Sequence, residues 1–153
     1  SAGSLSRSQI AALVSADGTL AATRGGATYM QTGGWEDQPC EFRAAISVSG
    51  AYDLLKLDWA CGWITPGVPW DHARRLGSPL EHVSANTKPM LLLHSDDDRS
   101  IPVDQANRMA AALTEHNVHH RYLHYTDRGH IGLTQDFVVE QPAKFIGEVE
   151  AHG

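Results

Sequence analysis

The amino-acid sequence predicts an α/β fold in which about three parallel strands lie between flanking helices. Residues Pro89–Leu93 form a short, wholly apolar segment of the kind that becomes a buried strand of a parallel sheet. Phe42–Val48 and His120–Tyr125 have the composition of two further strands. The amphipathic segments Val103–His116 and 134–150 are predicted helices that alternate with these strands. This alternation implies parallel pairing through right-handed crossovers.

The remaining segments are predicted to form a helix, a long loop and an irregular excursion. Residues 5–16 carry four apolar side chains roughly on one face, which predicts a helix. Residues 18–40 are rich in glycine and threonine and weakly patterned, so we expect a long loop with a helical turn near Thr28–Gln31. Residues 54–80 contain three of the four tryptophans and three prolines, and we expect a lid-like excursion there.

Composition and charge indicate one soluble globular domain that spans residues 1–153. Apolar residues make up 42% of the chain and charged residues 20%, as in ordinary globular proteins. The net charge of -6, with no basic run, argues against a nucleic-acid partner. The apolar runs are far shorter than a membrane span, and no signal peptide is visible. Cys40 and Cys61 alone define no disulfide scaffold, so the cellular compartment stays open.

Carboxylates and a histidine follow two of the predicted strands at the points where the strands end. Asp96, Asp97 and Asp98 come directly after the apolar strand, and His130 follows the next strand along the chain. The carboxyl ends of parallel strands meet at one edge of the sheet, where open α/β sheets keep their ligands. An aspartate that accepts a hydrogen bond from an imidazole fixes its tautomer, and the histidine can then act as general base to a hydroxyl nucleophile.

The nucleophile is expected on a strand-to-helix turn one crossover earlier. Ser1-Ala2-Gly3 occupies that place in the chain order, because it runs into the predicted helix 5–16. The order serine, aspartate, histidine is the order that this geometry requires.

These residues resemble the carboxyl-terminal half of an α/β-hydrolase, of the esterase and lipase kind with a prolyl-oligopeptidase-like catalytic domain. Ser1-Ala2-Gly3 matches the last three residues of the nucleophile elbow G-x-S-A-G. His94–Pro102 is similar to the family motif H-G-x-x-D-x-x-V-P, and Gly129-His130 matches the family's G-H. The likeness extends over essentially the whole chain.

The resemblance implies a catalytic triad and an oxyanion donor. Ser1 is the implied nucleophile, Asp98 the acid, His130 the base, and the Ala2 N–H the oxyanion donor. The implied reaction is hydrolysis of a small carboxylic ester through an acyl-enzyme, which needs no metal and no organic cofactor. Trp59 and Trp63 are candidates to line an acyl or aryl pocket, although they could equally form the core of the excursion.

The sequence also departs from the family pattern. It contains no counterpart of the family's first five strands or of the H-G-G-type loop that gives a second oxyanion N–H, so we expect a fragment or one chain of a split hydrolase. Losing one oxyanion donor costs on the order of 10²–10³ in rate. Without a preceding strand, residues 42–48 would have a free edge, where we expect a second copy or a missing amino-terminal half to pair.

Two other functions are compatible with the sequence. The chain could be a non-catalytic hydrolase remnant that acts as a binding or assembly module. The cluster Asp96–Asp98 could alternatively bind a divalent metal, although its spacing matches no known metal-binding loop.

Overall fold

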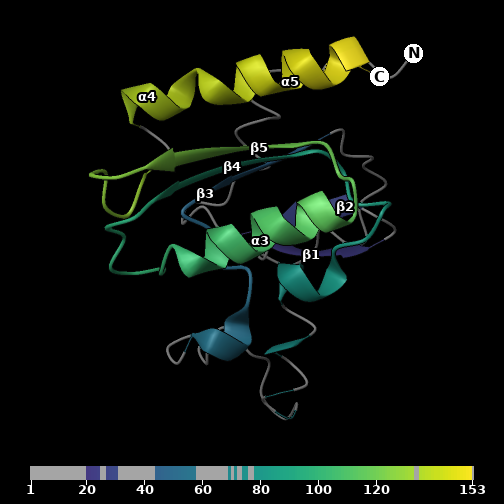
Figure 1. The fold of residues 1–153 in the computed structure, drawn as a ribbon, viewed down its shortest axis with the longest axis vertical. Helices are drawn as coiled ribbons and strands as arrows, with labels where there is room; N and C mark the ends of the chain where they lie inside the picture. The colour runs from purple at the N-terminus through teal and green to yellow at the C-terminus, as the bar shows by residue number, and fades with distance from the viewer. Residues whose placement is uncertain are drawn as a thin grey trace.

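A computed structural model shows a sheet layered between helices (Figure 1). Helices α4 (Asp136–Val139) and α5 (Gln141–His152) cover one face, and helix α3 (Asp104–Glu115) covers the other. This arrangement confirms the predicted α/β class. The structure describes residues 20–24, 27–30, 44–57, 69, 71, 74–75, 78–132 and 135–152.

The central sheet has three parallel strands in the order β3-β4-β5. These strands are β3 (Ala45–Val48), β4 (Met90–Ser95) and β5 (His120–Tyr125). The register aligns the first residues of all three strands, so their carboxyl ends lie at one edge. β5 has the predicted bounds, and β4 runs from Met90 to Ser95 where Pro89–Leu93 was predicted. β3 covers the last four residues of the predicted strand Phe42–Val48; Ala44 precedes it, and residues 42 and 43 lie outside the described residues.

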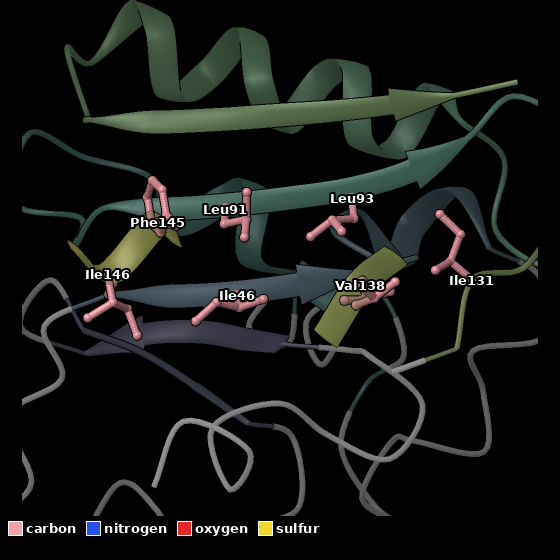
Figure 2. Packing of buried hydrophobic residues seen from close by; sticks show 9 residues of the cluster. Ile46, Leu91, Leu93, Ile131, Val138, Phe145 and Ile146 are labelled. Carbon is pink, nitrogen blue, oxygen red and sulfur yellow. The ribbon is translucent and has the colours of Figure 1, made fainter. Parts of the chain in front are cut away.

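Side chains of the strands alternate between two apolar clusters, one on each face of the sheet. On one face, strand side chains pack against α4 and α5, as Figure 2 shows for Ile46, Leu91, Leu93, Val138, Phe145 and Ile146. On the opposite face, the cluster combines strand and α3 side chains, namely Ala45, Met90, Leu92, Ala106, Met109 and Leu113. Burial on both faces is the reason that β3 and β4 are largely apolar, whereas β5 (HRYLHY) is partly exposed and carries polar side chains.

Helix α3 follows the predicted pattern to within one residue at each end. It begins after Pro102 and buries Ala106, Met109 and Leu113 at helical spacing. It ends at a left-handed Asn117 (φ 55°), where the Val118 N–H donates to the Leu113 carbonyl at 2.9 Å. This is the Schellman closure, which asparagine tolerates better than most residues.

The predicted helix 134–150 is wrong as a single element, because the structure has two helices that are separated at Glu140. Pro142 accounts for the break. It has no N–H to donate to the Val138 carbonyl, and its ring would clash with that carbonyl in a continuous helix. A new helix can begin with proline in its first turn, where no such bond is needed. None of the helices in the described part of the chain has the length and apolar character to cross a membrane.

The expected long loop over residues 18–40 contains a β-hairpin, so that prediction is wrong where the chain is described. β1 (Leu20–Arg24) pairs antiparallel with β2 (Ala27–Met30), and the predicted helical turn at Thr28–Gln31 overlaps β2. The Gly25-Gly26 dipeptide between the strands is a typical hairpin signal.

The excursion after β3 begins and ends at the same place in the fold. It begins with the short helix η1 (Leu54–Lys56), and η3 (Pro79–His82) follows on its return. The Leu80 N–H donates to the Tyr52 carbonyl, and the Leu54 N–H donates to Ser78 Oγ, both at 2.9 Å. These two bonds close the excursion beside the carboxyl end of β3. The predicted helix 5–16 lies outside the described residues.

Candidate active site

Asp98 lies just beyond the carboxyl end of β4 and is held as a buried hydrogen-bond acceptor. Its residue is 7% exposed, although it carries a carboxylate. One carboxylate oxygen, Oδ1, accepts from the backbone N–H groups of Ser100 and Ile101 at 2.8 and 2.9 Å. The turn thereby compensates the burial of the charge, and the second oxygen, Oδ2, remains available for another partner.

That partner is His130, in the loop after β5. Its Nδ1 lies 2.9 Å from Asp98 Oδ2. An ionised carboxylate can only accept, so Nδ1 carries the proton and Nε2 has a free lone pair. The His130 side chain is 40% exposed, and among the described residues Nε2 has no hydrogen-bond partner. The ring is therefore oriented through Nδ1, and Nε2 has no partner in the described part of the chain, which is the arrangement that a general base requires.

A second histidine, His94, lies beneath this pair and is fully buried. Its Nε2 donates to the Ile101 carbonyl at 2.9 Å and lies 3.5 Å from Asp98 Oδ2. His94 thus joins the end of β4 to the turn that holds Asp98. Burial is the main cause that lowers the pKa of His94, because the apolar surroundings disfavour the charged ring.

The backbone just before His130 is bound to side chains at the end of β4. The Gly129 N–H donates to Asp97 Oδ1 at 2.8 Å, and the Arg128 N–H donates to Ser95 Oγ at 3.0 Å. The Ser95 hydroxyl in turn donates to Asp97 Oδ1 at 2.6 Å. This hydroxyl bond, and after it the Gly129 N–H, holds the pKa of Asp97 below its ordinary value.

The backbone just after His130 is bound to the end of β3. The Ile131 N–H donates to Ser49 Oγ at 2.8 Å, and both residues are buried. Ser49 has a left-handed backbone (φ 50°), which is uncommon outside glycine. Gly50 follows because a Cβ there would lie 2.2 Å from Ser47 Oγ and 2.7 Å from the Tyr52 ring. The chain thus turns sharply as it leaves β3.

The three aspartates after β4 do not converge on one point, which contradicts the metal-binding alternative. Asp96 Oδ1 lies 2.5 Å from His124 Nε2, whereas Asp97 turns to Gly129 and Asp98 to His130. Among the described residues, no group of three or more histidine, cysteine, aspartate or glutamate side chains is arranged to hold a metal ion.

The structure brings together Asp98 and His130, as the sequence predicted, from two strand ends. Ser1, Ala2, Trp59 and Trp63 lie outside the described residues, so their assigned roles stay predictions. Sequence reasoning missed Ser49, Ser95 and Asp97 as partners of the loop around His130. The available signal was that each is a small polar residue at the carboxyl end of a buried strand.

Three solved structures are similar to this chain. An acetyl ester-xyloside bifunctional hydrolase from Caldicellulosiruptor lactoaceticus has 23% identity and a TM-score of 0.61, over 76% of this chain and 47% of that chain. A carboxylesterase from Lactobacillus plantarum has 18% identity and a TM-score of 0.58, over 77% and 47%. A puromycin-hydrolyzing peptidase from Mycobacterium tuberculosis has 28% identity and a TM-score of 0.57, over 71% and 18%.

The chain therefore spans about half the length of the first two structures and less than a fifth of the peptidase. No curated protein matches. A family model described as the prolyl oligopeptidase family matches residues 22–147, which include β3, β4, β5 and the Asp98–His130 pair. The chain belongs to the prolyl oligopeptidase family of serine hydrolases, and its parallel sheet is part of an α/β-hydrolase fold.

Proposed function

We propose that the chain carries out serine esterase chemistry on small carboxylic esters, with Ser1 as nucleophile, His130 as base and Asp98 as acid. One observation carries the proposal: a buried carboxylate binds Nδ1 of a histidine at 2.9 Å, and the opposite ring nitrogen of this 40% exposed side chain has no hydrogen-bond partner among the described residues. This is the arrangement that an acyl-transfer base needs, because orientation is fixed on one side and proton transfer occurs on the other.

The proposed reaction has two steps of acyl transfer. Ser1 Oγ attacks the ester carbonyl carbon and passes its proton to His130 Nε2, while the Ala2 N–H stabilises the oxyanion. The alkoxide leaves with that proton, and the acyl group remains on Ser1. Water then attacks the acyl-enzyme, again through His130, and releases the acid. Throughout, Asp98 stabilises the imidazolium by its bond to Nδ1.

Ester substrates are preferred to peptides in this proposal. Two of the similar solved structures are named as an acetyl ester-xyloside bifunctional hydrolase and a carboxylesterase, while a third is named as a puromycin-hydrolyzing peptidase. Peptide cleavage would use the same groups, so the two substrate classes are separated by assay. Turnover of p-nitrophenyl acetate without turnover of a matched p-nitroanilide would support the ester assignment, and the reverse would contradict it.

A serine-directed fluorophosphonate tests the nucleophile directly. The Ser1 oxygen would form a bond to phosphorus as the phosphorus–fluorine bond breaks, with fluoride leaving and the proton passing to His130. Mass spectrometry of tryptic peptides should find the adduct on Ser1 in the native chain and not in His130→Ala. Absence of any adduct would contradict the esterase proposal and favour the non-catalytic binding or assembly module.

The proposal includes a partner at the outer edge of β3. Within the described residues this strand pairs only with β4, and its four side chains are all buried. A second copy or a chain that carries an amino-terminal half could add strands there. Light scattering during size-exclusion chromatography should give a mass above that of one chain, and a monomer of unchanged mass at high concentration would contradict self-association.

A further inference from the structure

We propose that Asp97 is a positioning residue for His130, which holds the turn at Arg128 and Gly129 so that the imidazole meets Asp98. The catalytic part of this inference rests on the proposed esterase function. The structural part, that Asp97 sets the orientation of the ring, can be tested without any turnover.

Asp97 and Ser95 together bind the backbone that precedes His130. A serine hydroxyl has one proton, and that of Ser95 is directed to Asp97 Oδ1 at 2.6 Å. The lone pairs of Ser95 Oγ are therefore free to accept from the Arg128 N–H at 3.0 Å. Asp97 also accepts the Gly129 N–H directly at 2.8 Å. One carboxylate oxygen thus organises two successive backbone amides that immediately precede His130.

Hydrogen bonds from the end of β4 hold the backbone of this turn. Gly129 has φ 59°, in the left-handed region that favours glycine, and among the described residues the space around its ideal Cβ position is open. The N–H groups of Arg128 and Gly129 are bound by Ser95 and Asp97. The Arg128 guanidinium adds a weaker contact, 4.5 Å from the centre of the Phe137 ring.

The residue after His130 is held by the core. Ile131 is 3% exposed and belongs to the apolar cluster that lies under α4 and α5, at the end of that cluster near the carboxyl ends of the strands (Figure 2). Its N–H donates to Ser49 Oγ. Among the described residues, His130 itself has only the ring bond to Asp98. Because the core holds the segment after His130, the orientation of the ring depends on the segment before it, which Asp97 binds.

Asp96 is a matched control for Asp97. It is the adjacent aspartate and is also exposed, but its carboxylate pairs with His124 instead of the turn. Replacing either residue removes the same charge at nearly the same place. A difference between the two variants therefore reports the contact with the turn and not the charge.

The experiment compares Asp97→Ala, Asp97→Asn, Asp96→Ala and His130→Ala with the native 153-residue chain. In p-nitrophenyl acetate hydrolysis, Asp97→Ala should lower kcat about 10–100-fold with KM changed less than about twofold, because a small misplacement of a base costs this much. Asp97→Asn keeps an acceptor oxygen and should retain much of the kcat that Asp97→Ala loses. Asp96→Ala should stay within about twofold of the native chain.

The activity-independent readout is the tautomer of His130, measured by long-range ¹H–¹⁵N spectra of chain labelled with ¹⁵N-histidine in alkaline buffer. The His130 signals are those missing in His130→Ala. Native chain and Asp96→Ala should keep the Nδ1–H tautomer, and Asp97→Ala should shift toward a mixture. If Asp97→Ala does not fold by circular dichroism, Asp97→Asn and Ser95→Ala carry the comparison.

Two results separate the failure of this inference from the failure of the esterase proposal. Absence of His130-dependent turnover in the native chain would contradict the esterase proposal. The tautomer measurement alone would then decide whether Asp97 positions the His130 ring. Asp97 variants with the native tautomer, or with the same losses as Asp96→Ala, would overturn the positioning role.

Discussion

In the described part of the chain, two pairs join an aspartate after β4 to a histidine in or after β5, and only one of them has the surroundings that a catalytic pair requires. Asp98–His130 and Asp96–His124 join the same two chain segments at 2.9 and 2.5 Å. The Asp98 side chain is 0% exposed, whereas the side chains of the second pair are 46% and 44% exposed. Asp98 also accepts two backbone N–H groups. Distance alone thus does not distinguish the pairs, but burial and additional hydrogen bonds do.

The positions of the two histidines along the chain explain much of this difference. His124 is part of β5, where its ring stacks on Tyr122 with centroids 5.3 Å apart on the exposed surface. His130 lies in the following loop, and the backbone on both sides of it is bound by side chains from the ends of β3 and β4. A base needs this support, since a misplaced group loses most of its rate advantage.

The largest expected contrast is in turnover after removal of each aspartate. Asp98→Ala should lower kcat for p-nitrophenyl acetate by about 10³–10⁴-fold, because the imidazole loses the partner that fixes its tautomer. Asp96→Ala should change kcat less than about twofold. Similar losses in both variants, measured on protein of equal folded fraction, would remove the distinction between the pairs.

A smaller contrast is expected in stability. Asp98→Ala leaves the N–H groups of Ser100 and Ile101 without their acceptor, which should cost about 1–3 kcal/mol in the free energy of unfolding. Removing Asp96 or His124 should cost about 0–1 kcal/mol, since exposed ion pairs are weak and screened by salt. Urea unfolding of the variants at low and high salt measures both. An equal loss in the free energy of unfolding for Asp98→Ala and Asp96→Ala would contradict the stabilising role given to the buried Asp98 carboxylate.

The buried His94 beside the Asp98–His130 pair should make stability depend on pH. Its pKa is lowered in the folded chain from the ordinary 6.5, so below that pH the unfolded chain binds a proton that the folded chain does not. The His94 contribution is therefore present above pH 6.5 and is lost as pH falls toward and through the folded pKa. As the pH is lowered from about 7 to about 5, the urea midpoint of unfolding should decrease less in His94→Gln than in the native chain. Parallel curves would contradict this role.

The predictable parts of this molecule are those in which local pattern and burial agree. β5, α3 and the approach of Asp98 to His130 followed from apolar periodicity, from turn residues and from the rule that parallel strands end at one edge. The break between α4 and α5 was predictable from Pro142, whose missing N–H outweighs the apolar pattern of 134–150. The β1–β2 hairpin was missed because weak patterning hid a short strand pair on either side of Gly25-Gly26.

The support around His130 could not be predicted in the same way. Asp97 and Ser49 act on backbone amides 32 and 82 residues away in sequence, and which N–H groups they reach depends on the register of the strands and the turns that follow. A polar residue after a strand marks a position where such a contact can form. It does not identify the amide that is bound, since Asp96, Asp97 and Asp98 have one side chain type and three different partners.

The most direct test of the central claim is p-nitrophenyl acetate hydrolysis by the native chain, His130→Ala and His124→Ala, measured side by side at equal folded fraction. We expect turnover in the native chain and in His124→Ala, with a loss of at least about 10³-fold in His130→Ala. Turnover that is equal in all three, or lost equally in both variants, would contradict the assignment of His130 as the base.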